Sequence, residues 1–415
     1  MAAQCPNCAG RLIFDPASQR LLCESCGSRF APEEVEDENA ERHTKYYDAN
    51  IYVCSHCGAE VIITGSEAST FCAYCGNPAI VFSRVSKEVR PDGIVPFQIT
   101  KARAMELIRE RMKGSPFIPN EIKALGEDHL RGIYIPYWIV TADFTDVLAI
   151  TGKVKDKQST GYDPGPFDKI GQMRGFGGRG YRYGSFASKG YHYEFFARAG
   201  SARFNAVPID GSRMLNDEFS MKLEPFDFRD ARVFDEDYLN GFYSNVSDLS
   251  YNELKKSAGD RCHKLFADEA LKTVKAKEPT VTDHISWIDI EDGSPYMLMP
   301  VWFFTFTYKG NPHTILVNGQ TGKVVGTFPW MKARFGWTLF GIGLPVFVLS
   351  CLLFSAMIKT GAYGVSRLFT IVSSLLMTTG PVLLAIGLNG IKRISNNLKL
   401  TQSEKMFSYV NRRKG

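Results

Sequence analysis

The sequence lacks the motifs that mark the common catalytic sites. It has no P-loop, no H-E-x-x-H helix and no G-x-S-x-G nucleophile elbow. The histidines between residues 91 and 330 are scattered, with no second metal ligand at helical or hairpin spacing: His129, His192, His263, His284 and His313. We therefore expect a protein that is not an enzyme.

A signal peptide and a basic excess are also missing from most of the chain. The first residues have neither a basic n-region nor an apolar h-region, so we expect no cleaved signal peptide. Residues 1–90 carry a net charge of −4 and residues 91–330 a net charge of −1. The last segment, 331–415, carries +10. A basic segment beside apolar spans favours a membrane partner over nucleic acid.

Cysteine is present in a repeated pattern. Eight of the ten cysteines form four Cys-x-x-Cys pairs, and 14 residues separate the two pairs of each group. The second group follows the first by 49 residues at every position, which indicates an internal duplication. The eight residues are Cys5, Cys8, Cys23, Cys26, Cys54, Cys57, Cys72 and Cys75.

This spacing is typical of zinc ribbons. Two Cys-x-x-Cys turns close a tetrahedral four-sulfur site around Zn²⁺, and the glycines at Gly27, Gly58 and Gly76 permit a positive φ after a cysteine pair. Disulfides, a rubredoxin-like iron site and redox-active dithiols are the alternatives, and a reducing cytosol disfavours disulfides. Four thiolates leave no position for a catalytic water, so we predict two structural zinc ions. We interpret His43 and His56 as bystanders.

The predicted N-terminal domains are zinc ribbon 1 (1–30), an acidic linker (31–50) and zinc ribbon 2 (51–90). Their net negative charge disfavours phosphate binding. The acidic run of the linker is either a solvated segment or a docking surface for a basic partner. We therefore expect the ribbons to contact protein rather than nucleic acid.

Charge is absent from two segments of 24 residues, 335–358 and 368–391. Each exceeds the ~20 residues that a helix needs to cross a bilayer, so we predict a transmembrane hairpin over residues 335–391. Basic residues before the first span and after the second place both termini in the cytoplasm. Because the spans lack ionisable groups, they favour an anchor over a transporter. The basic cytoplasmic tail, 392–415, is either an amphipathic helix on the membrane or a frayed segment.

The middle domain, 91–330, is predicted to be α+β with a mainly antiparallel sheet. Helices are expected over 100–113 and about 250–276, the second with a Ser250/Glu253 capping box. The apolar stripe expected on this second helix makes Cys262 a core residue and comprises Leu254, Ala258, Cys262, Leu265 and Phe266.

Two stretches of the middle domain, 132–144 and 296–308, suggest a duplicated hairpin. Each contains a P-x-W motif, and each is followed by a Thr-Gly pair that we interpret as a turn, at Thr151 and at Thr321. The second hairpin resembles those of PepSY-type modules. We interpret the tryptophans as core residues.

The stretch 159–200 is rich in glycine, arginine and aromatic residues. Its G-x-G-x-x-G at Gly175, Gly177 and Gly180 lacks the surrounding βαβ unit of a dinucleotide site. RNA binding through Arg-Gly repeats is an alternative. We predict a long hairpin with aromatic strands, one of them at 191–196.

The order of these parts resembles a bacterial family with duplicated zinc ribbons, over about residues 5–390. Members are often labelled TFIIB-type zinc ribbon or primosomal-protein-like, but this sequence has no helicase motor. Some members are encoded beside SPFH-domain and phage-shock PspA proteins, which implies an adaptor in envelope stress or membrane remodelling. The motifs that carry the resemblance, besides the cysteines, are V-P-F at 95–97, the two P-x-W strands, V-P-I-D-G-S at 207–212, E-P-F-D at 224–227 and N-G-Q-T-G-K at 318–323.

We therefore expect a non-enzymatic adaptor, an integral protein of the bacterial cytoplasmic membrane, that recruits cytosolic proteins to the inner membrane face. SPFH-domain and PspA-like proteins are the expected partners, in a homo- or hetero-oligomer. The alternative is a membrane-tethered regulator that binds nucleic acid, which the near-neutral charge of residues 1–330 disfavours.

Overall fold

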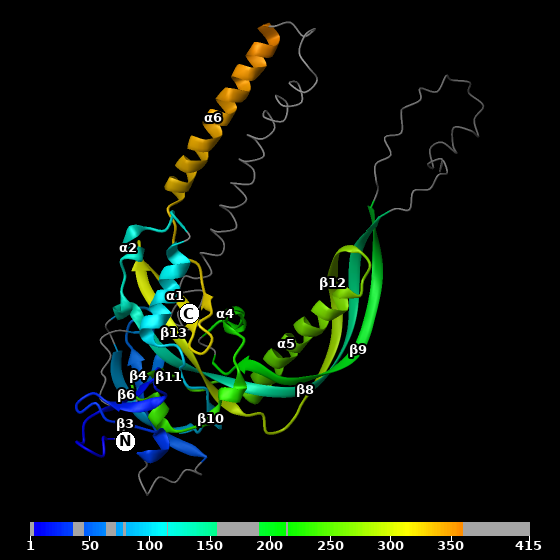
Figure 1. The fold of residues 1–415 in the computed structure, drawn as a ribbon. Helices are drawn as coiled ribbons and strands as arrows, with labels where there is room; N and C mark the ends of the chain where they lie inside the picture. Colours follow the sequence, from blue (N-terminus) through cyan, green and yellow to red (C-terminus); the bar gives the residue numbers. More distant parts are fainter. Residues whose placement is uncertain are drawn as a thin grey trace. The chain divides into compact units, whose positions relative to one another are not determined.

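The computed structural model describes residues 4–35, 45–63, 72–77, 80–113, 115–155, 191–212 and 215–359. It divides the chain into two compact units (Figure 1). Unit 1 comprises Met1–Ile139, Asp210–Leu249 and Pro295–Gly415, and unit 2 comprises Val140–Ile209 and Ser250–Ser294. This division passes through the predicted middle domain.

Unit 1 is built on a mixed sheet. The two P-x-W strands, β8 (Leu130–Lys155) and β13 (Tyr296–Tyr308), pair with each other antiparallel, with Tyr134 opposite Pro300. The sheet continues from β8 through β11 to the strands of the second cysteine group. The other strands of this sheet are β4 (Tyr46–Cys54), β5 (Glu60–Ile63), β6 (Ile80–Val89), β7 (Gly93–Ile94), β10 (Arg232–Val233), β11 (Tyr243–Ser244), β14 (Asn311–Asn318) and β15 (Val324–Val325).

Strand β13 is buried on both faces, as its almost uninterrupted apolar sequence requires. Its even-numbered side chains, including Trp302 and Phe304, pack in one cluster with α1 (Lys101–Lys113). Its odd-numbered side chains, including Val301 and Phe303, pack in another with α4 (Asp217–Leu223). Because adjacent side chains of a strand point to opposite faces of the sheet, β13 contributes to both clusters.

Short elements complete unit 1. The first cysteine group carries a separate small sheet of β1 (Leu12–Asp15), β2 (Arg20–Cys23) and β3 (Arg29–Phe30). The remaining helical turns are η1 (Pro32–Glu34), α2 (Asn120–Lys123), η2 (Glu127–His129), η3 (Phe228–Asp230) and η4 (Glu236–Leu239).

Unit 2 is a sheet covered on one face by a helix. Strand β8 pairs with β9 (Tyr191–Asp210) and, antiparallel, with β12 (Lys277–Ile290). Helix α5 (Tyr251–Lys272) packs against the face that carries Leu148 and Ile150. The predicted strand at 191–196 is confirmed as part of β9, whereas the G-x-G-x-x-G lies outside the described residues.

Three local predictions about the helices are confirmed and one is wrong. Helix α1 begins one residue after the predicted start, and α5 carries the predicted Ser250/Glu253 capping box. Burial of Cys262 raises the pKa of its thiol to about 11, in agreement with a core position. Leu265, by contrast, is exposed, because the buried stripe of α5 continues through Ala267 instead.

The predicted turn at Thr151–Gly152 is also wrong. Strand β8 runs without a break through both residues, because β12 pairs with it there, with Thr280 opposite Thr151. The second Thr-Gly pair, Thr321–Gly322, is a turn, as predicted. Gly322 has a φ of 75° and lies between β14 and β15. The duplication therefore extends to the P-x-W strands but not to their turns.

Helix α6 (Lys332–Lys359) contains the first predicted span. Within the part of the chain that the structure describes, no helix has the length and apolar character of a membrane crossing. The second predicted span and the basic tail lie outside the described residues, so the transmembrane hairpin stays a prediction.

Candidate metal centres

The first cysteine group forms a compact four-sulfur cluster at one end of the small sheet. Cys5 Sγ lies 3.6 Å from Cys26 Sγ, and Cys8 Sγ lies 3.5 Å from Cys23 Sγ. A tetrahedral zinc ion with sulfur at ~2.3 Å requires sulfur–sulfur separations of about 3.8 Å. Cys5 and Cys23 are buried, whereas Cys8 and Cys26 are exposed.

The second group has the same geometry in a more buried setting. Cys54 Sγ lies 3.8 Å from Cys75 Sγ, and Cys57 Sγ lies 3.7 Å from Cys72 Sγ. Three of these cysteines are buried and Cys75 is intermediate. The sulfur atoms of each group lie within 4.8 Å of one another, so each group fits one metal ion. His56 is not among these ligand atoms, and His43 lies outside the described residues.

All four Cys-x-x-Cys turns share one backbone pattern. The N–H of the first cysteine donates to the carbonyl five residues on, as from Cys5 to Gly10 and from Cys54 to Ala59. The N–H four residues on donates back to the carbonyl of that cysteine, as from Gly27 to Cys23. These paired bonds hold both sulfurs of a pair on the same side of the turn.

The residue that closes each turn has a left-handed backbone. Gly27, Gly58 and Gly76 have φ values of 73°, 78° and 71°. The fourth turn places Ala9 at the same position, with a φ of 54°. The predicted need for glycine is therefore met in three turns, and in the fourth an alanine adopts a conformation that costs L-residues about 1–2 kcal/mol.

Hydrogen bonding favours a thiolate in each cluster. In the first, the side chain and backbone of Ser28 lower the pKa of Cys26 to about 6. In the second, the thiols of Cys57 and Cys72 lower the pKa of Cys54. Because thiolates and not thiols bind metal, Cys26 and Cys54 are the ligands that the two clusters offer most readily.

The second cluster is part of the core of unit 1. Cys72 and Tyr74 are buried, and Tyr74 packs edge-on against Phe303 of β13. The Asn245 amide donates a hydrogen bond to the Tyr74 hydroxyl. The Thr305 hydroxyl donates to the carbonyl of Ala73, within the Cys-x-x-Cys turn. This turn therefore supports the central strand directly.

The first cluster is tied to unit 1 through its small sheet. The Phe14 N–H donates to the Asn240 carbonyl at 3.0 Å, and the Gln19 side chain donates to the Phe97 carbonyl at 2.7 Å. The rings of Phe14 and Tyr238 lie 5.1 Å apart. Both cysteine groups thus pack onto the protein core.

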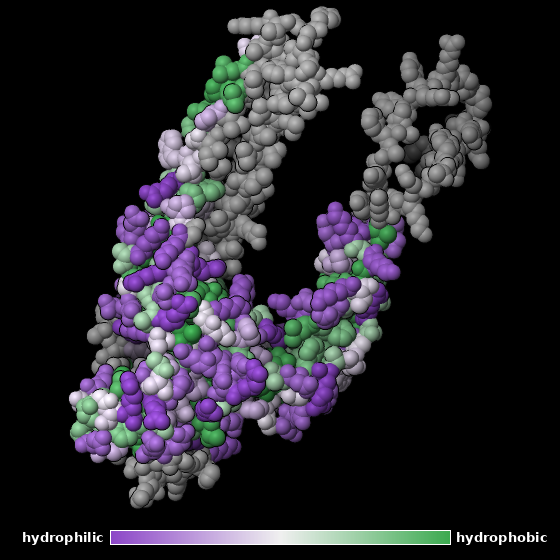
Figure 2. Space-filling model, viewed as in Figure 1, coloured by the Kyte–Doolittle hydropathy of each residue, from purple (hydrophilic) through white to green (hydrophobic). Residues whose placement is uncertain are grey.

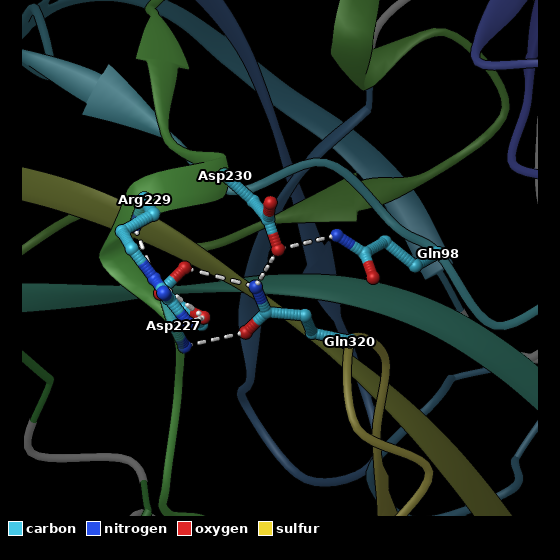
Figure 3. A network of polar contacts seen from close by, with 5 residues as sticks. All are labelled: Gln98, Asp227, Arg229, Asp230 and Gln320. Atoms are coloured by element: carbon cyan, nitrogen blue, oxygen red, sulfur yellow. Dashed lines mark hydrogen bonds and ion pairs between the residues drawn. The ribbon is translucent and has the colours of Figure 1, made fainter.

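Motifs that carry the family resemblance in the sequence contact one another within unit 1. Asn318 of the N-G-Q-T-G-K segment is buried, and its amide donates to the carbonyls of Leu223 and Pro225. Gln320 donates to Asp230, which also accepts from Gln98 (Figure 3). The network joins the N-G-Q-T-G-K and E-P-F-D motifs and includes Gln98, the residue after V-P-F. It is structural in character, because its polar groups bond one another.

The acidic pairs and the tryptophans also have structural roles. Asp227 and Asp235 cap two helical turns, because each accepts a hydrogen bond from the backbone at the start of η3 or η4. The indole N–H of Trp138 donates to Ser247, and that of Trp302 donates to the Ile99 carbonyl. Both indole N–H groups therefore bond within the fold.

Sequence reasoning missed a third group of metal-ligand type. Asp146, His263 and His284 have ligand atoms within 4.8 Å of one another. The interpretation of these histidines as scattered is therefore wrong. The signal that was available is Asp146 itself, which occupies an inward position of β8 between Phe144 and Leu148, where an apolar residue is expected.

Fold and clusters together define a mixed α+β protein with two four-cysteine sites suited to metal. No family model matches the chain, and no solved structure was found to match it. The chain is 27% identical over 340 residues to "Uncharacterized protein YdjG" of Bacillus subtilis (strain 168), a match that covers 80% of this chain and 91% of the relative. The name assigns that relative no activity, and the predicted family membership stays a prediction.

Proposed function

We propose that the protein is a non-enzymatic adaptor that holds two structural zinc ions and recruits cytosolic proteins to the inner face of the cytoplasmic membrane. The observation that carries the proposal is the closed character of both cysteine clusters. Each supplies four sulfur ligands, so neither leaves a position for substrate or water. Zinc is the metal proposed because tetrahedral four-thiolate sites favour it or an iron–sulfur centre.

Exposed apolar residues on α6 support the membrane part of the proposal. Residues 335–358 contain no charged residue, and hydrophobic residues of α6 are visible at the surface in Figure 2. The large apolar side chains exposed on this helix are Trp337, Phe340, Leu344, Val348, Leu349 and Leu352. Exposed apolar surface of this extent marks contact with a partner or a membrane.

A surface of unit 2 supports the recruiting role. The sheet face opposite α5 carries five exposed apolar side chains, which we call the outer face: Val147, Tyr193, Phe195, Ile285 and Trp287. Phe195 is 83% exposed and Trp287 79% exposed. Aromatic residues of this kind are the usual anchors of protein interfaces. We propose that this face binds the recruited protein.

The test is affinity purification of the full chain from native membranes in mild detergent. We expect the chain to sediment with membranes and to retain partners in fixed ratio, SPFH-domain or PspA-like proteins among them. The double variant Phe195→Ser/Trp287→Ser should lose those partners and remain in the membrane. The matched control Val233→Ser, at an exposed residue of unit 1, should retain them.

A second double variant tests the membrane anchor. Leu344→Lys with Val348→Lys places two charges on α6 and should release the chain into the soluble fraction, since each charge costs roughly 3 kcal/mol in a bilayer. Repeated recovery of the wild-type chain alone would contradict the recruiting role. A soluble wild-type chain would contradict the anchor.

A further inference from the structure

The third ligand group lies wholly within unit 2 and joins three of its elements. His263 comes from α5, Asp146 from β8 and His284 from β12, three elements labelled in Figure 1. His263 Nδ1 lies 2.6 Å from Asp146 Oδ2, and His284 Nδ1 lies 3.7 Å from Asp146 Oδ1. The two imidazole rings stack with centroids 3.7 Å apart.

The pairing of β8 with β12 produces this arrangement. Ser286 lies opposite Asp146, so His284, two residues earlier on the same strand, is on the same sheet face as Asp146. That face is covered by α5, whose buried residues Ala258 and Cys262 bring His263 over the sheet. The fold therefore fixes all three side chains on rigid elements, which favours a defined site over a chance surface cluster.

The aspartate is the least expected member. Asp146 is 0% exposed, and its Oδ1 has no hydrogen-bond partner among the described residues. Burying a carboxylate costs several kcal/mol unless a positive charge or hydrogen bonds compensate. Only one of its oxygens, Oδ2, is satisfied, by His263. The other oxygen faces His284 at a distance too long for a hydrogen bond.

The two stacked imidazole rings lie beside the same buried carboxylate, so three ligand atoms converge on one point. A metal dication bound by two neutral imidazoles and one carboxylate supplies the positive charge that the buried carboxylate requires. It also gives the second carboxylate oxygen a partner.

We propose that Asp146, His263 and His284 bind a third metal ion, a divalent transition metal of the zinc class. Nitrogen ligands from two histidines disfavour Mg²⁺ and Ca²⁺, which take oxygen ligands. Zinc bound by nitrogen and oxygen at ~2.0–2.1 Å needs ligand atoms about 3.3 Å apart, and the three present lie within 4.8 Å. On metal binding the His263 Nδ1–Asp146 Oδ2 separation of 2.6 Å would lengthen, and the His284 Nδ1–Asp146 Oδ1 separation of 3.7 Å would shorten. The His284 side chain is 41% exposed, so a metal ion can reach the site from solvent.

The test measures metal in the full-length chain, purified in mild detergent with a tag that lacks histidine. After zinc is supplied and free metal removed, mass spectrometry gives the metal-to-protein ratio. Wild type should hold one equivalent more than the two cysteine sites account for. His263→Ala/His284→Ala should lose that equivalent, and so should Asp146→Leu, which suits the apolar surroundings of Phe144 and Leu148.

His192→Ala is the matched control, because His192 is another histidine of unit 2 and contacts Glu194 at a distance of 2.8 Å. This variant should keep the wild-type metal content. X-ray absorption at the zinc edge of wild type needs no variant and should show nitrogen and oxygen neighbours beside sulfur. A sulfur-only shell with both cysteine sites loaded, or a double variant with wild-type metal content, would overturn the proposal.

Discussion

The ring of Tyr74 packs edge-on against the ring of Phe303, with centroids 5.4 Å apart and planes at 88°. Tyr74 lies between Cys72 and Cys75, and Phe303 lies on β13. The contact joins a metal-binding turn to the central strand of unit 1. Folding of the second cysteine cluster and folding of the sheet are therefore coupled.

Tyr74→Ala should destabilise unit 1 by roughly 3–5 kcal/mol, since it removes a fully buried aromatic side chain. Tyr74→Phe should cost roughly 1–3 kcal/mol, because the Asn245 amide loses the hydroxyl that accepts its hydrogen bond. Denaturant unfolding monitored by tryptophan fluorescence measures both. Equal effects for the two variants would show that the ring contact contributes little.

Ala9→Gly should stabilise the first cysteine group by roughly 1 kcal/mol, because glycine adopts a φ of 54° without steric cost. Competition with a chelator measures the change, as slower loss of metal. Gly58→Ala, at the equivalent position of the second group, is the matched reverse change and should accelerate loss. If Ala9→Gly had no effect, the turns would not limit metal retention.

Asp237→Asn should make stability less dependent on pH. Burial, followed by the charge of Asp235, raises the pKa of Asp237 to about 7 from an ordinary value of 3.8. A raised pKa means that the folded state favours the protonated carboxyl, so stability falls as pH rises from about 4 through 7.

The asparagine variant avoids this loss and keeps an oxygen that accepts the hydrogen bond from Asn240. Its free energy of unfolding should exceed that of wild type at pH 8 by an amount on the order of 1–2 kcal/mol, and by much less at pH 5. The exposed Asp268→Asn serves as control. A gain that is the same at both pH values would contradict the assigned cause.

Asn318→Ala should destabilise unit 1 by roughly 3 kcal/mol. The Asn318 side chain donates to two carbonyls and accepts from the N–H groups of Gln320 and Thr321, both at 2.8 Å. Its loss leaves several buried groups unpaired. Asn311→Ala, at the exposed start of β14, should change stability by less than about 0.5 kcal/mol. Thermal unfolding of both variants checks the difference.

The cysteine clusters and helix ends were predictable because their determinants are local in sequence. A Cys-x-x-Cys turn, or the Ser250/Glu253 capping box, is specified by residues within a few positions. The third ligand group was not predictable in this way. His263 and Asp146 are 117 residues apart, and only strand pairing and helix packing bring them together.

Contacts distant in sequence also explain why the predicted turn at Gly152 is wrong. A Thr-Gly pair permits a turn, but it does not require one. The long pairing of β12 with β8, from Ile290 opposite Ala142 to Lys277 opposite Lys153, keeps the strand extended. The equivalent Gly322 has no such partner strand to hold it extended within the described structure, and it turns.

The measurement that tests the central claim most directly is hydrogen exchange of the full-length chain before and after metal is removed by a chelator. If the cysteine clusters are structural metal sites built into the core, metal removal should accelerate exchange in both clusters and in β13, around Phe303 and Thr305. Exchange that rises only within the Cys-x-x-Cys turns, with β13 still protected, would contradict the claim.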